Sequence, residues 1–94
     1  MIKWIVAYDI PDDRRRRKLA DTLEDFGDRV QYSVFEVIMR GDDLSTLLQR
    51  IAAVILEDED AVRLYPLCES CSEKVRVLGV GREEPWKEPD VYIV

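Results

Sequence analysis

The stretch from Val30 to Met39 constrains the fold most strongly, because its strand-like pattern reverses in the middle. Its apolar and aromatic residues fall on two opposite parities, first Val30, Tyr32 and Val34 and then Phe35, Val37 and Met39. Side chains alternate between the two faces of a strand, so a shift of one residue sends every later side chain to the opposite face. We therefore expect the chain to bulge, bend or reverse direction near Val34 and Phe35.

Three further segments have the composition of strands. They are rich in β-branched and aromatic residues and cover residues 2–9, 61–67 and 74–80. Pro66 cannot donate a ladder hydrogen bond, so the second of these segments is expected at a sheet edge or a bulge.

Two segments have helical spacing. Leu19, Leu23 and Phe26 share one face of a helix over residues 13–26. Asp12 is a suitable N-cap for this helix, and Gly27 stands where a C-cap glycine belongs. The second helix follows Gly41-Asp42-Asp43 and carries Leu44, Leu47, Leu48, Ile51 and Ile55 at the helical period.

If the reversal near Val34 separates two strands, these elements predict an α+β fold, the ferredoxin-like βαββαβ sandwich. Its helices cover one face of the sheet, and the uncovered face predicts a sheet-to-sheet homodimer. We assign residues 1–81 to this domain. Residues 82–94 are expected to form an acidic linker and an additional C-terminal strand at 91–94, which joins the partner or sister subunit.

Length and composition narrow the class of protein. Ninety-four residues are enough for one domain with one core. No apolar run approaches the roughly 20 residues of a membrane helix, and the chain opens on a strand pattern instead of a signal peptide, so we expect no membrane contact and a cytoplasmic location. The net charge of −6 disfavours nucleic-acid binding by bulk charge and directs attention to local basic clusters.

One such cluster lies at the start of the first predicted helix. It consists of the five consecutive cations Arg14, Arg15, Arg16, Arg17 and Lys18. Cations at a helix N-terminus oppose the helix dipole, so they do not serve helix stability. Contact with nucleic-acid phosphates explains the run. The alternative is a solvated basic face balanced by Asp12, Asp13 and Asp21.

Asp9 is the strongest candidate for chemistry. It closes an apolar strand, where a carboxylate must be solvated or paired. It either caps the following helix, a task that Asp12 and Asp13 can also perform, or binds a hard cation such as Mg²⁺. One carboxylate per chain is a poor cage, but a two-fold axis near Asp9 would supply a second.

Cys68 and Cys71 form a Cys-x-x-Cys pair, and the chain contains no histidine. A zinc site would need two more ligands, which a dimer could supply by sharing the metal. A thioredoxin-type redox pair would open a helix after a strand, whereas this pair is expected in a short connection between two strands. We therefore expect two reduced thiols at a strand end.

These residues together resemble a known family, the small Cas-two proteins, which are CRISPR-associated adaptation proteins found beside the CRISPR integrase. The resemblance rests on Tyr8-Asp9-Ile10, the basic helix start with Arg16 and Lys18, the stretch Gln31-Tyr32-Ser33-Val34-Phe35-Glu36, and the strand from Val62 to Cys68. It extends to about residue 81, and the hexapeptide Gln31 to Glu36 is its most specific part.

The resemblance implies a homodimer with the ferredoxin-like fold and a metal site at Asp9. It implies a metal-dependent endoribonuclease, with double-stranded DNA as the substrate of some members, or a non-catalytic bridge that holds DNA between integrase dimers. By position, Tyr8, Arg16, Lys18, Arg29 and Phe35 match family residues near the active cleft. Asp9, Tyr8, Arg29 and Phe35 are thus the catalytic candidates. A toxin-like ribonuclease or a ligand sensor unrelated to CRISPR is the alternative.

Overall fold

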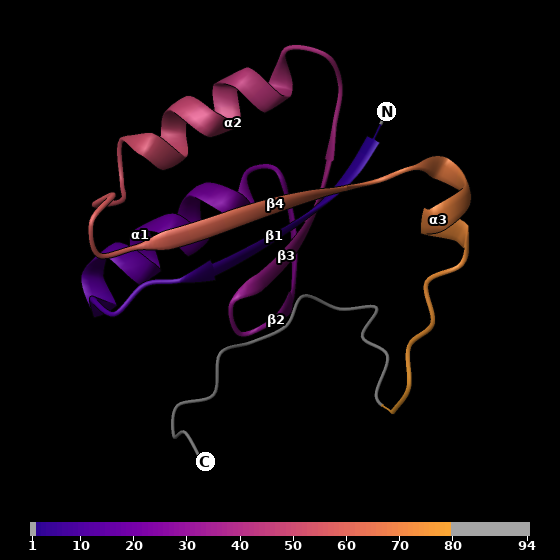
Figure 1. The fold of residues 1–94 in the computed structure, drawn as a ribbon, viewed down its shortest axis with the longest axis horizontal. Coiled ribbons are helices and arrows are strands. Elements are labelled where there is room, and N and C mark those ends of the chain that lie inside the picture. Colours follow the sequence, from indigo (N-terminus) through magenta and orange to yellow (C-terminus); the bar gives the residue numbers. More distant parts are fainter. Residues whose placement is uncertain (1, 80–94) are drawn as a thin grey trace.

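The computed structural model describes residues 2–79 and shows the predicted alternation of strands and helices. In chain order the elements are β1 (Ile2–Asp9), α1 (Asp13–Glu24), β2 (Gly27–Gln31), β3 (Val34–Met39), α2 (Asp43–Ala52), β4 (Ala61–Leu67) and α3 (Glu69–Glu73). The strands form one antiparallel sheet in the order β2-β3-β1-β4 (Figure 1). The α+β class and the βαββαβ order of the first six elements are therefore confirmed.

The predicted reversal near Val34 is a tight turn between two strands. Gln31, the last residue of β2, pairs with Val34, the first residue of β3, so Tyr32 and Ser33 alone form the turn. The register also shifts between Arg29 and Gln31. The change of parity in the sequence therefore marks a change of strand, as expected.

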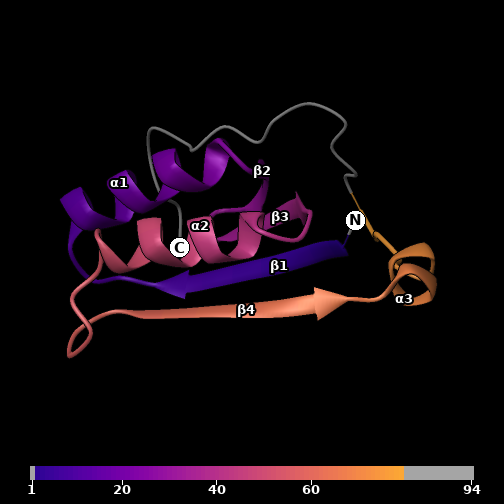
Figure 2. The same ribbon diagram turned by 90° about the horizontal axis from the view of Figure 1, so that it is seen from above.

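Helices α1 and α2 pack on the same face of the sheet (Figure 2). The side chains buried most completely between these layers are Phe35, Leu19, Leu23, Leu47, Val6 and Val37. Burial of each stabilises the fold by roughly 1.5–3 kcal/mol relative to an exposed position. The helix face of the sheet is thus a closed core.

The other face of the sheet is covered by neither α1 nor α2 (Figure 2). Ile5, Ala7 and Asp9 lie on this face of β1, because Val6 and Tyr8 between them point into the core. Neighbouring strands add Ile38, which is 55% exposed, and Tyr65, which is 48% exposed. Apolar side chains therefore share the open face with the ion pair between Lys3 and Glu36.

Two predicted helix boundaries have different outcomes. Asp12 is the N-cap of α1, as predicted, and its carboxylate accepts the backbone N–H of Arg15 at 2.9 Å. Gly27 is not a C-cap glycine, because α1 is capped by Asp25 and Gly27 begins β2. A Cβ atom on Gly27 would lie 2.0 Å from the carbonyl oxygen of Glu36, so the close approach of β2 and β3 explains this glycine.

The prediction of a strand at residues 74–80 is wrong for its described part. The short helix α3 follows β4 directly, Lys74 caps it, and residues 75–79 form no strand. Val77 is 67% exposed and Leu78 is 95% exposed, so these residues lack the packing that stabilises a strand. Val80, the acidic linker and the predicted strand at 91–94 lie outside the described residues.

Two smaller expectations concern Pro66 and membrane contact. Pro66 lies on β4, which is an edge strand among the described residues, as its missing N–H predicted.

Within residues 2–79 no helix is both long and apolar enough to span a bilayer.

Candidate functional site

Asp9 ends β1 with its side chain exposed on the open face of the sheet. Its Cα atom is paired with that of Ala61 on β4. No hydrogen bond or ion pair within residues 2–79 engages its carboxylate, and the cap of α1 is Asp12 instead. The helix-capping interpretation of Asp9 is therefore wrong, and the carboxylate is available to a ligand or to a second chain.

The donor chemistry of Asp9 fits a hard cation, but one chain does not complete a site. Within the described part of the chain, no three Asp, Glu, Cys or His side chains are placed to hold a metal ion. Mg²⁺ binds through one or two carboxylates and completes its shell with water and phosphate oxygens. A site at Asp9 therefore requires the carboxylate of another copy or the oxygens of a substrate.

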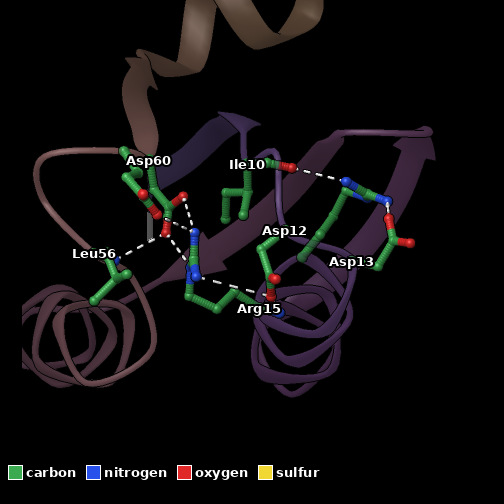
Figure 3. Close-up of polar contacts among 8 residues, drawn as sticks. Ile10, Asp12, Asp13, Arg15, Leu56 and Asp60 are labelled. Atoms are coloured by element: carbon green, nitrogen blue, oxygen red, sulfur yellow. Dashed lines mark hydrogen bonds and ion pairs between the residues drawn. The ribbon is translucent and has the colours of Figure 1, made fainter.

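Arg15 is held by acidic residues that are distant in the sequence (Figure 3). Its Nε donates to Asp60 Oδ2 at 2.8 Å, and its Nη2 donates to Asp60 Oδ1 at 3.0 Å and to Glu59 Oε2 at 3.0 Å. The Asp60 side chain is fully buried and also accepts the backbone N–H of Leu56 at 2.9 Å. Arg15 therefore joins the start of α1 to the loop before β4.

These contacts also set the ionisation of the pair. The hydrogen bonds from the Arg15 guanidinium lower the pKa of Asp60 below its usual value, and they raise the pKa of Arg15. Both groups are thus charged at neutral pH, and the fork of Arg15 is already occupied by carboxylates.

A small pocket lies between α1 and the β2–β3 turn, on the helix side of the sheet. It has a volume of about 100 Å³ and is lined by Tyr8, Asp13, Arg16, Arg17, Ala20, Arg29 and Tyr32. The Arg16 guanidinium lies 5.9 Å from the centre of the Tyr32 ring and donates to the carbonyl of Ile10 at 2.8 Å and to Asp13. Three guanidinium groups, those of Arg16, Arg17 and Arg29, therefore line the pocket beside the Asp13 carboxylate, and guanidinium groups are suited to binding phosphate oxygens.

Two of the catalytic candidates lie in the core. Phe35 is fully buried and Tyr8 is 6% exposed, with their ring centres 6.3 Å apart. The Tyr8 hydroxyl donates to the carbonyl of Tyr32 at 3.3 Å, and the Arg29 guanidinium lies 5.2 Å from the centre of the Phe35 ring. The Tyr8 and Phe35 side chains therefore pack against Tyr32 and Arg29, which line the pocket.

The five-cation run divides into two groups. Arg15 and Arg16 form ion pairs with acidic residues, as the solvated-face interpretation expects for part of the run. Arg14, Arg17 and Lys18 are exposed and have no ion pair within residues 2–79. Arg14, Arg17 and Lys18 are therefore the members of the run that are best placed to contact phosphates.

The structure brings together some of the predicted site residues and separates others. Tyr8, Arg16 and Arg29 meet at the pocket, whereas Asp9 points to the opposite face of β1. Sequence reasoning did not identify the partner of Arg15, Asp60, although the acidic run at residues 57–60 was visible. Nothing in the local sequence reveals that the Tyr32 ring lies beside the Arg16 guanidinium.

Comparisons with known proteins agree with this geometry. The family model described as "CRISPR associated protein Cas2" matches residues 1–75. The "CRISPR-associated endoribonuclease Cas2 3" of Synechocystis sp. is 43% identical over 94 residues, covering 100% of this chain and 99% of that protein.

Solved structures give the same result. Streptococcus pyogenes Cas2 is 30% identical, with a TM-score of 0.74 over 82% of this chain and 99% of that chain. A chain of a partial Cas6-RT-Cas1–Cas2 complex is 30% identical, with a TM-score of 0.65 over 83% of this chain and 91% of that chain. The resemblance inferred from the sequence is therefore confirmed, and this chain belongs to the Cas2 family of CRISPR-associated proteins.

Proposed function

We propose that this protein is a metal-dependent endoribonuclease of CRISPR spacer acquisition, with Mg²⁺ or another hard divalent cation held by Asp9. The observation that carries the proposal is the exposed Asp9 carboxylate, which no described residue engages. Relatives across the full length of the chain are named endoribonucleases, and this supports the assignment of the reaction class. The substrate is accordingly RNA, with duplex DNA as the second candidate.

The site is completed by a homodimer in which two open sheet faces pack against each other. Asp9 shares its face of β1 with Ile5 and Ala7, so apolar contact of the two faces brings the two Asp9 carboxylates toward a common axis. The exposed side chains of Ile38 and Tyr65 enlarge the apolar area available to a second copy.

The residues of the chain have distinct tasks in this proposal. A divalent cation, when bound, lowers the pKa of a water molecule and neutralises charge on the scissile phosphate. Arg17 lines the pocket without an ion pair within residues 2–79 and is the first to hold phosphate oxygens there, while Arg16 and Arg29 add positive charge beside it. Tyr8 and Phe35 are positioning residues, because they are buried beneath Arg29 and Tyr32.

Removal of divalent cations tests the proposed chemistry. Purified protein treated with EDTA is expected to lose cleavage of single-stranded RNA and to regain it when Mg²⁺ is added in excess, because the cation supplies the activated water. The fraction of labelled RNA cleaved is measured over time on a denaturing gel. Cleavage that continues at the same rate in EDTA would contradict the proposal.

A second candidate function is a non-catalytic adaptor that binds DNA and docks on the CRISPR integrase. It is favoured by the exposed cations Arg14, Arg17 and Lys18, which are suited to phosphate contact without any metal. We assign the integrase contact to a Cas1 protein, because a structural relative is found in a complex with Cas1.

Neutralising the exposed cations tests this adaptor function. The triple variant Arg14→Gln, Arg17→Gln, Lys18→Gln is expected to bind duplex DNA more weakly and to lower the slope of log K against log salt by about 2–3, at roughly 0.9 per phosphate contact. Fluorescence anisotropy at several salt concentrations gives the slope.

The matched control for this series is Lys74→Gln, because Lys74 is an exposed cation at the end of α3. It should leave the salt slope unchanged. A loss of slope per removed cation equal to that of the triple variant would show that only the net charge matters. An unchanged slope in the triple variant would exclude these three cations as phosphate contacts.

A further inference from the structure

The two thiols of the chain lie at the end of β4 in a setting that the sequence did not predict. β4 ends at Leu67 and α3 begins at Glu69, so the Cys68-Glu69-Ser70-Cys71 segment opens a helical turn directly after a strand. Redox-active Cys-x-x-Cys pairs have this setting, whereas the expected connection between two strands does not. The expected connection between two strands is therefore wrong, whereas the expectation of two reduced thiols at the end of a strand is confirmed.

Hydrogen bonds of this turn place the Cys68 sulfur against the backbone of Cys71. The backbone N–H of Cys71 donates to the Cys68 sulfur at 3.3 Å, and the Cys68 carbonyl accepts the backbone N–H of Ser72 at 2.8 Å. Residues three apart in a helical turn have Cα atoms roughly 5 Å apart. A disulfide spans Cα distances of roughly 4.4–6.8 Å, so closure needs no large rearrangement of the backbone.

The two thiols also differ in reactivity. Both are exposed and unbridged. The Ser70 hydroxyl lies 3.4 Å from the Cys68 sulfur, and hydrogen bonds from Ser70 and Cys71 lower the pKa of Cys68 to about 7. The hydrogen bond between the Cys71 and Cys68 side chains raises the pKa of Cys71. Cys68 is therefore the better nucleophile near neutral pH, and Cys71 is placed to resolve its products.

A zinc site explains this pair less well. A structural zinc ion takes four ligands, and the chain has two cysteines and no histidine. Within residues 2–79 no third acidic or sulfur ligand is placed to complete such a site.

We propose that Cys68 and Cys71 form a redox-active dithiol that exchanges with low-molecular-weight disulfides. The Cys68 thiolate attacks one sulfur of the small disulfide, forms a mixed disulfide and releases one small thiolate. The Cys71 thiolate then attacks the Cys68 sulfur, closes the intramolecular disulfide and releases the second small thiolate. The protein loses two electrons and two protons, which leave with the two small thiols. This chemistry does not depend on the nuclease site.

Intact mass spectrometry of the full chain tests the proposal. Reduced protein is incubated with oxidised glutathione near neutral pH and quenched with acid. We expect the wild type to lose two hydrogen atoms without accumulating a glutathione adduct, and we expect dithiothreitol to reverse the change. Wild-type protein that accumulates glutathione on both thiols, forms disulfides between chains or remains reduced would overturn the proposal.

Two single variants assign the roles of the thiols. Cys71→Ser is expected to accumulate one stable glutathione adduct, because Cys68 can no longer be resolved. Cys68→Ser is expected to react several-fold more slowly than Cys71→Ser, because the pKa of Cys68 is lowered and a larger share of Cys68 than of Cys71 is thiolate near neutral pH. Equal rates of the two variants would contradict the assignment of Cys68 as the nucleophile. Circular dichroism shows that each variant is folded, and the wild-type result decides the proposal if one is not.

Discussion

Asp9→Asn is expected to lower RNA cleavage by about 100-fold or more while leaving the fold intact. The amide keeps one oxygen ligand but removes the negative charge, and a dimer loses two such charges from one metal site. Asp9 is exposed and packs against no part of the core, so the substitution removes no buried contact. Initial cleavage rates of wild type and variant at saturating Mg²⁺ measure the effect.

Binding of the cation itself provides a second measurement for this variant. A ligand that binds the folded protein raises its melting temperature, so Mg²⁺ is expected to raise the Tm of the wild type and not that of Asp9→Asn. Without metal, two facing carboxylates repel each other, and the variant should be as stable as the wild type or more stable. Light scattering is expected to give the same dimer mass for both proteins.

Asp21→Asn is the matched control, because Asp21 is an exposed carboxylate on α1 with no ion pair in the described part of the chain. Its cleavage rate should equal that of the wild type. If Asp9→Asn cleaves RNA at the wild-type rate, the metal site at Asp9 is wrong. If neither the wild type nor Asp9→Asn cleaves RNA and the two proteins bind DNA equally well, the adaptor function explains the result.

Gly27→Ala is expected to destabilise the protein by about 3 kcal/mol, which is large for the addition of one methyl group. The new Cβ atom would lie 2.0 Å from the Glu36 carbonyl oxygen and 2.6 Å from the Val37 Cα atom. Both are backbone atoms of β3, which cannot turn aside as a side chain can. The β2 strand must therefore move away from β3. Thermal unfolding followed by circular dichroism should show the Tm falling by roughly 4–8 °C for each kcal/mol.

Gly41→Ala provides the control for this substitution. A Cβ atom on Gly41 would meet no atom within 4 Å. The same chemical change is expected to leave stability unchanged or to raise it by about 0.4–1 kcal/mol, because alanine restricts the unfolded chain. Equal Tm values for the two variants would show that β2 and β3 leave room for a Cβ atom on Gly27 and would contradict the close approach of the two strands.

The site illustrates how one strand serves two surfaces. Tyr8 and Asp9 are neighbours in the sequence, but alternation along β1 sends Tyr8 into the core below the arginine-lined pocket and Asp9 to the open face. A nucleic acid that reaches both surfaces must pass the end of β1, where α1 begins. The exposed Arg14 and Arg17 lie in the first turns of that helix.

Local patterns in the sequence were sufficient for the order of the first six elements. The change of parity at Val34 predicted the β2–β3 turn, since side-chain alternation is a property of each strand alone. The spacing of Leu19 and Leu23 predicted the buried face of α1, and Asp12 predicted its start. The unusual position of a carboxylate at the end of an apolar strand was enough to single out Asp9.

Other features were decided only by the tertiary structure, because they depend on residues that are distant in the chain. Arg15 meets Asp60, 45 residues away, and no local spacing shows that this cation is already paired. Gly27 was assigned to a helix end because its conflict is with the β3 backbone, which comes near only when the sheet forms. The valine pattern after Cys71 predicted a strand, but alternation stabilises a strand only where a sheet and a core are present to receive it.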